Sequence, residues 1–135
     1  MNLKEVMTKK QSSLIQVLIV EDEALIGWSL SRILQKAGFA VTVVNTGEKA
    51  IEKFCASHFD IVLTDYKLPK IDGYVVASKI KANSPLVPVI LMSAYDNYPA
   101  GNNILRSSID QFIEKPFTLS EITNVLRAFT VNLKK

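Results

Sequence analysis

Short apolar runs alternate along the chain with longer segments of helical periodicity. Ile61–Leu63 is one such run, and it ends in the polar pair Thr64 and Asp65. Continuous apolar runs of this length, rich in β-branched residues and bounded by polar ones, are typical of strands buried on both faces. The predicted strands are Gln16–Val20, Ala40–Val44, a third strand that ends at Asp65, Val87–Met92 and Gln111–Glu114.

Helical spacing of apolar residues, with capping signals, fills the intervals between these strands. Gly38 ends the first helix, and Asp72 is the expected N-cap of the third. A capping box, Thr118 with Glu121, opens the last. The predicted helices are 24–36, 45–57 with Asn45 at its start, 73–82, a short one over 100–107, and a last one whose apolar stripe is Leu119, Ile122, Leu126 and Phe129. Five such βα units predict an α/β fold, a doubly wound parallel sheet with helices on both faces.

Composition fits one soluble domain and narrows the classes of function. Hydrophobic residues make up 48% of the 135 residues and charged residues 21%. The net charge of +3 owes much to lysines near the two ends, which gives little support for nucleic-acid binding. The longest uncharged stretch, Ala82–Tyr95, contains two prolines, so no membrane span is expected. A single cysteine favours a cytoplasmic protein. We expect a leader over 1–14, a domain over 15–131 and a tail over 132–135.

Two residues of the helices allow a structural or a functional interpretation. Trp28 falls on the side of its helix opposite the apolar stripe. Its ring either lies back over neighbouring aliphatic stems or contacts a partner. Cys55 is expected to be a small buried hydrophobe, which is the usual role of a lone cysteine in a helix.

Polar side chains stand where the predicted strands end. They are Glu21 and Asp22 after the first strand, Asp65 after the third, Ser93 after the fourth and Lys115 after the fifth. The carboxyl ends of parallel strands meet at one edge, where α/β sheets bind ligands. Two carboxylates 4 Å apart repel by ~1–4 kcal/mol, depending on the local dielectric, and Mg²⁺ relieves such repulsion. An aspartate beside a cation and a lysine can accept a phosphoryl group.

Each of these signals is weak alone, since acids after a strand are ordinarily loop or capping residues. Their joint placement, with each group at the end of a different strand, is a much stronger signal. Four segments carry a specific resemblance to a known family: Val17–Glu23, Leu63–Gly73, Val89–Ala94 and Phe112–Phe117. The chain resembles the CheY-like receiver domain of two-component response regulators over about residues 16–129. The resemblance implies a flavodoxin-like sheet with strand order 2-1-3-4-5 and five helices.

The resemblance also implies a phosphoacceptor and a magnesium site. Asp65 would be the phosphoacceptor. Asp22 and Asp65 would bind Mg²⁺ directly, with the backbone carbonyl of Lys67 as a third protein ligand. Glu21 would act through metal-bound water.

Other residues would bind the phosphoryl group or change conformation after phosphorylation. Ser93 and Lys115 would contact the phosphoryl group, and Phe112 holds the position of the aromatic switch. The surface of the fourth helix, fifth strand and fifth helix would then change. Trp28 is our candidate for kinase contact, and bulky Tyr95 is expected to hinder water and prolong the phosphorylated state.

As a receiver, the protein would catalyse only its own phosphorylation and dephosphorylation. Its partners would be a histidine kinase or phosphotransfer protein and an output domain or target, with the receiver a monomer or weak homodimer that binds no nucleic acid directly. A haloacid dehalogenase-type phosphatase is disfavoured because Lys67 stands where that class needs an aspartate. A flavin binder is disfavoured because Glu21–Glu23 would repel phosphate. A pseudo-receiver, an interaction module that takes no phosphate, stays an alternative.

Overall fold

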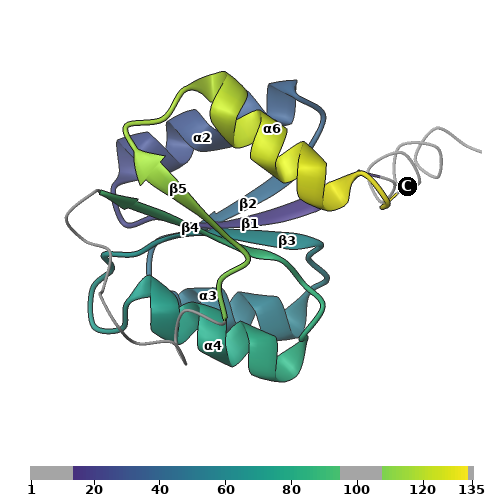
Figure 1. The fold of residues 1–135 in the computed structure, drawn as a ribbon. Coiled ribbons are helices and arrows are strands. Elements are labelled where there is room, and N and C mark those ends of the chain that lie inside the picture. Colours follow the sequence, from purple (N-terminus) through teal and green to yellow (C-terminus); the bar gives the residue numbers. More distant parts are fainter. Residues whose placement is uncertain (1–13, 95–107, 134–135) are drawn as a thin grey trace, which may run out of the picture.

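A single parallel sheet organises the molecule. The computed structural model describes residues 14–94 and 108–133. Within them, five parallel strands lie in the order β2-β1-β3-β4-β5 (Figure 1). This confirms the predicted α/β class and the flavodoxin-like strand order. The strands are β1 Gln16–Val20, β2 Ala40–Val44, β3 Ile61–Asp65, β4 Val89–Ala94 and β5 Gln111–Lys115.

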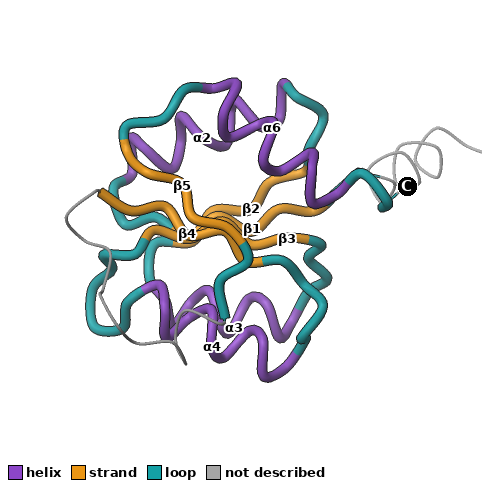
Figure 2. Tube along the Cα trace, viewed as in Figure 1, coloured by secondary structure: helices purple, strands orange, loops and turns teal. Residues whose placement is uncertain are grey.

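Helices cover both faces of this sheet, as a doubly wound fold requires. Helices α2 and α6 lie on one face, and α3 and α4 lie on the other (Figure 2). The described residues hold four helices: α2 Ala24–Lys36, α3 Gly47–Ala56, α4 Gly73–Asn83 and α6 Leu119–Thr130. The helix predicted over 100–107, and Tyr95, lie outside the described residues. In the described part of the chain, no helix is long and apolar enough to cross a membrane.

The core consists of two layers, one on each face of the sheet, because side chains alternate along each strand. All five residues of β3 are buried, as its apolar run predicts. Leu18 and Val62 face α3 and α4, whereas Ile19 and Leu63 face α2 and α6. Each fully buried aliphatic side chain of this kind contributes ~1.5–3 kcal/mol to folding. The central strands β1 and β3 are therefore held between two buried layers of side chains.

Side-chain caps fix the starts of three helices. Asp72 accepts a hydrogen bond from the Val75 N–H (3.0 Å), and Thr118 accepts one from the Glu121 N–H (3.1 Å), both as predicted. The predicted start of the second helix was one residue early. Thr46 is its N-cap and accepts from the Lys49 N–H (3.1 Å), which leaves Asn45 outside the helix.

Two further expectations were wrong. Cys55 is exposed, because the inward face of α3 at this turn is taken by Phe54, and the next residue is rotated by ~100°. Strand β4 begins at Val89, two residues later than predicted. The Val87 N–H closes a turn onto the Ser84 carbonyl (3.2 Å), and Pro88 has no N–H to give to a ladder.

Candidate functional site

Three carboxylates converge at the carboxyl ends of β1 and β3. Glu21 and Asp22 directly follow β1, and Asp65 is the last residue of β3. The two strands are neighbours, with Val20 paired to Thr64. One oxygen of each acid lies within 4.8 Å of the others. Glu21 and Asp65 are buried while Asp22 is exposed, so the cluster opens toward solvent on the side of Asp22.

Lys115 brings a positive charge to this cluster from the far edge of the sheet. It ends β5, two strands away from β3, and its side chain reaches across β4. Its Nζ lies 3.1 Å from Oδ1 of Asp65 and 3.7 Å from Oε1 of Glu21. The ammonium group therefore balances part of the acidic charge. It stands where it can also contact a group attached to Asp65.

Glu21 carries an electrostatic cost in this arrangement. Burial and the neighbouring Asp65 carboxyl raise the pKa of Glu21 from 4.5 to about 8, although Lys115 and its positive charge oppose that rise. Neither carboxylate oxygen of Glu21 has a hydrogen-bond partner among the described residues. A hard divalent cation takes oxygen ligands and would favour the ionised acid, so the donor set fits Mg²⁺.

An open cleft of about 620 Å³ lies beside these groups. Its lining includes Asp22, Asp65 and Lys115. Lys67 also lines it, from the loop between β3 and α4. The cleft leaves space for a small group beside the carboxylate of Asp65.

Tight backbone packing fixes the loop behind Asp65. The Gly73 N–H donates to the Tyr66 carbonyl (2.8 Å), and the Tyr66 N–H donates to the Met92 carbonyl (2.9 Å). A Cβ on Gly73 would collide with the backbone carbonyl oxygen of Asp65. Glycine at this position therefore lets α4 start directly against the strand end that carries Asp65.

Ser93 lies inside β4 and is buried. Its Oγ donates to the carbonyl of Ala94 (3.1 Å), and Ala94 is the β4 residue that lines the cleft. The hydroxyl is therefore occupied within its own strand in this structure.

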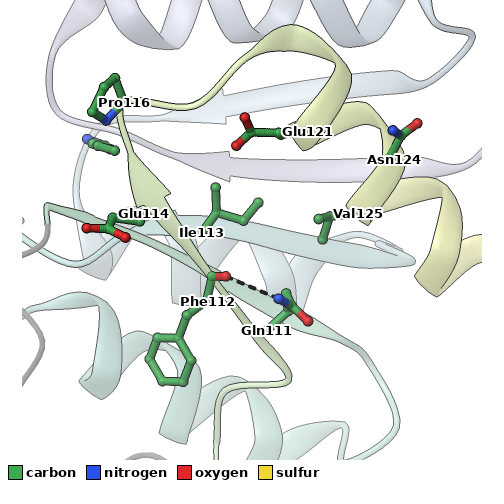
Figure 3. A pocket seen from close by; sticks show the side chains of 9 residues that line it. Gln111, Phe112, Ile113, Glu114, Pro116, Glu121, Asn124 and Val125 are labelled. Carbon is green, nitrogen blue, oxygen red and sulfur yellow. Dashed lines mark hydrogen bonds between the residues drawn. The ribbon is translucent and has the colours of Figure 1, made fainter.

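Phe112 projects from β5 toward α4, on the opposite side of the strand from Ile113 (Figure 3). Its ring centroid lies 6.3 Å from that of Tyr74, which is fully buried in α4. Tyr74 in turn meets Tyr66 edge-on at 5.5 Å. Phe112 thus contacts the core through an aromatic row that begins at the residue after Asp65.

Trp28 lies on the outer side of α2, and it lines a cleft that Glu21 also lines. It is 58% exposed, as its helical phase predicts. The guanidinium of Arg32 lies 5.0 Å from the centre of its ring. The indole is thus stacked on one side and open on the other.

The sequence interpretation did not identify the supporting residues. A Cβ on Gly27 would lie only 3.1 Å from the side chain of Val43, so this glycine lets α2 pack closely against β2, beside Glu21. Beneath Asp65, Gly73 allows the close approach of α4, and the buried ring of Tyr74 packs against Tyr66. A glycine near the start of α2 and of α4 was the available signal, since glycine is unfavourable within helices unless a close contact requires it.

Comparisons with known proteins agree on one family. The sequence profile described as "Response regulator receiver domain" matches residues 17–127. The chain is 34% identical over 114 residues to the transcriptional regulatory protein QseB of Haemophilus influenzae, covering 84% of this chain and 52% of that protein. It is 38% identical over 112 residues to the sensory transduction protein RegX3 of Mycolicibacterium smegmatis, covering 83% and 49%. The chain thus spans about half the length of these two relatives.

Solved structures give the same result. The response regulator TrrA of Thermotoga maritima, in complex with Mg²⁺-BeF, superposes with a TM-score of 0.79 at 28% identity, covering 86% of this chain and 99% of that one. The receiver domain of the sensor histidine kinase PA1611 of Pseudomonas aeruginosa, with a magnesium ion in its active-site cleft, superposes with a TM-score of 0.77 at 28% identity, covering 86% and 97%.

Proposed function

We propose that this chain, which belongs to the response regulator receiver domain family, accepts a phosphoryl group on Asp65. The observation that carries the proposal is the placement of Asp65. Its carboxylate lies among two further acids and 3.1 Å from the Lys115 ammonium, at the mouth of an open cleft. A structural carboxylate would have no reason to be grouped with two others.

The proposed step is a transfer from the phosphohistidine of a kinase or phosphotransfer protein. An oxygen of Asp65 attacks phosphorus, and the P–N bond breaks with its electron pair passing to the imidazole nitrogen. Lys115 contacts the transferring group and neutralises part of its charge. Ser93 turns its hydroxyl from the Ala94 carbonyl to a phosphoryl oxygen. The chain acts on itself and turns over no separate substrate.

A bound Mg²⁺ would supply charge neutralisation for the phosphoryl oxygens during the transfer. Asp22, Asp65 and the backbone carbonyl of Lys67 would hold it, with Glu21 acting through water. The clustered carboxylates and the raised pKa of Glu21 support this set. The two magnesium-bearing structures named above support magnesium binding as such.

Phosphorylation would change the surface around β5, where a partner could recognise it. Phe112 is half-buried against Tyr74, and its ring has no hydroxyl, so its movement would act through packing alone. A change in that packing would alter the β5 and α6 face, where a shallow cleft lies between Gln111 and Asn124 (Figure 3).

The remaining proposals concern partners and boundaries. We assign kinase contact to the α2 face that includes Trp28. The response to phosphorylation would be carried out by a further domain or by a separate target protein. The receiver would span residues 15–131, between a leader and a short tail, and would work in the cytoplasm as a monomer or weak homodimer. Direct DNA contact is not assigned to this domain, although the relatives include transcriptional regulators.

Intact-protein mass spectrometry after incubation with acetyl phosphate tests the central proposal. We expect one phosphoryl adduct that requires Mg²⁺ and is absent in Asp65→Asn. Asp72→Asn is the matched control, because it makes the same change in the adjoining loop and asparagine also caps helices. No adduct, under conditions that label another receiver, would overturn the proposal in favour of a pseudo-receiver.

A further inference from the structure

The two edges of the sheet are protected unequally. In the described residues, β2 and β5 are the edge strands. Strand β5 carries charged residues at Glu114 and Lys115, whereas Ala40–Val44 contains no charge, no proline and no glycine. Every residue of β2 is at least partly exposed. Edge strands normally carry charges, prolines or bulges, because their unpaired backbone groups can otherwise template another strand. Strand β2 has none of these protections.

The outward backbone groups of β2 belong to two valines. The Ala40 N–H donates to the Ile15 carbonyl (2.9 Å), so Ala40 bonds toward β1. In a parallel ladder the bonding side alternates from residue to residue. Val41 and Val43 therefore point their N–H and C=O groups away from β1, which gives two donors and two acceptors at the edge.

Space is open on both faces of this edge. A cleft of about 530 Å³ is lined on the α2 side by Trp28, Ser31 and Val43, and it extends to Val44 and past the end of β2 to Lys49. On the α3 side, a cleft of about 440 Å³ is lined by Val44, Lys49, Glu52, Lys53 and Ala56. Val43 itself is 39% exposed. Alternate side chains of an added strand would therefore have room above and below the sheet.

We propose that a second copy of this chain pairs antiparallel with β2, about a two-fold axis through Thr42. Val41 of each copy would lie opposite Val43 of the other and exchange both N–H···O bonds with it. The four outward groups of each edge are then all bonded. Thr42 would face the Thr42 of the second copy in a non-hydrogen-bonded pair, which is favourable for two threonines. The two sheets would join into one of ten strands.

The edge is suited to its own copy because the pairing is isologous. The outward groups are placed symmetrically about Thr42, so one register satisfies both chains. The α3-side cleft offers charges of both signs, Lys49 and Lys53 beside Glu52, which is the composition a surface needs to meet itself. The pairing is short, so we expect association at high protein concentration.

Disulfide cross-linking tests the register. In a Cys55→Ser background, Thr42→Cys would place two thiols across a pair with Cα atoms ~4.5 Å apart, within the range of a disulfide. Ala40→Cys, on the same face, would leave its two Cα atoms ~14 Å apart. We expect Thr42→Cys to cross-link at least tenfold faster under mild oxidation. Equal rates for the two variants would overturn the proposed pairing.

Sedimentation equilibrium of the unmodified chain tests the association itself. We expect a concentration-dependent dimer, with a dissociation constant raised at least tenfold in Val43→Lys. Leu86→Lys adds the same charge at a residue that is 95% exposed on the α4–β4 turn, and we expect it to leave dimerisation unchanged. A chain that stays monomeric at the highest soluble concentration, or whose dimer survives Val43→Lys, would refute the inference.

Discussion

Replacing Glu21 by glutamine removes a buried acid whose ionisation opposes folding in the metal-free protein. Burial and the adjacent Asp65 carboxyl raise the pKa of Glu21 from 4.5 to about 8. The unfolded chain ionises this group near its ordinary pKa, so between these two values it binds fewer protons than the folded state. The stability that the protonated acid gives is thus complete below the unfolded pKa. It is lost as pH rises toward the folded pKa.

The size of this loss of stability follows from the pH interval between the unfolded and the folded pKa of Glu21. Each unit of pKa difference corresponds to ~1.4 kcal/mol, so Glu21 is expected to lower the free energy of unfolding by roughly 2–3 kcal/mol between about pH 5 and pH 7. Glutamine keeps the shape of the side chain and has nothing to titrate. We therefore expect the stability of Glu21→Gln to decline much less over the same interval, with the variant more stable than the wild type at neutral pH.

Urea denaturation in the presence of a chelator, at several pH values, measures the difference. The other titrating groups are common to both proteins and cancel in the comparison. Glu23→Gln serves as the control, because it makes the same chemical change at a neighbouring residue that is exposed. Parallel pH profiles for the wild type and Glu21→Gln would refute the assignment of a buried, raised-pKa acid to this position.

Three further outcomes are expected. Magnesium binding near neutral pH should release about one proton in the wild type and almost none in Glu21→Gln, because the metal favours the ionised acid. Calorimetry in two buffers of different ionisation enthalpy measures this, and equal release would contradict it. Gly73→Ala should destabilise the fold by roughly 1–3 kcal/mol and slow labelling by acetyl phosphate, since its methyl meets the backbone of Asp65. Thermal denaturation and mass spectrometry check both effects, and a wild-type melting temperature would count against the predicted clash. Leu63→Ala should cost roughly 2–5 kcal/mol, because Leu63 is fully buried. The exposed Leu86→Ala should cost under about 0.5 kcal/mol, and similar urea midpoints for the two variants would argue against this core.

The sequence was sufficient to predict the sheet and the convergence of its acids. Runs such as Ile61–Leu63 are apolar on both faces, as expected for strands of a parallel sheet covered on both sides, and a polar residue follows each run. Since all strands point the same way, Glu21, Asp65 and Lys115 had to meet at one edge. The strand order came from the family resemblance, because periodicity alone does not determine which strands are neighbours.

What the sequence did not predict depends on local choices with small energy differences. Asn45 and Thr46 are both good N-caps, and the structure uses the second. Cys55 is apolar enough for the core, yet Phe54 occupies the inward position at that turn of α3. The hydrogen bond of the Ser93 hydroxyl could not be predicted from the sequence either. Its hydroxyl bonds the Ala94 carbonyl, and side-chain rotation of a serine leaves no trace in the sequence.

Asp65 and Lys115 are held differently, and this difference indicates where a new charge would act. The strand end that carries Asp65 is fixed by the hydrogen bond from Tyr66 to Met92 and by the close approach of Gly73. Lys115 is joined to its strand by a long, flexible side chain that is 26% exposed. An added phosphoryl group would therefore move the ammonium group more readily than the carboxylate. Because that ammonium group is carried by β5, an edge strand, the structural response should begin at β5 and leave the central strand β3 in place.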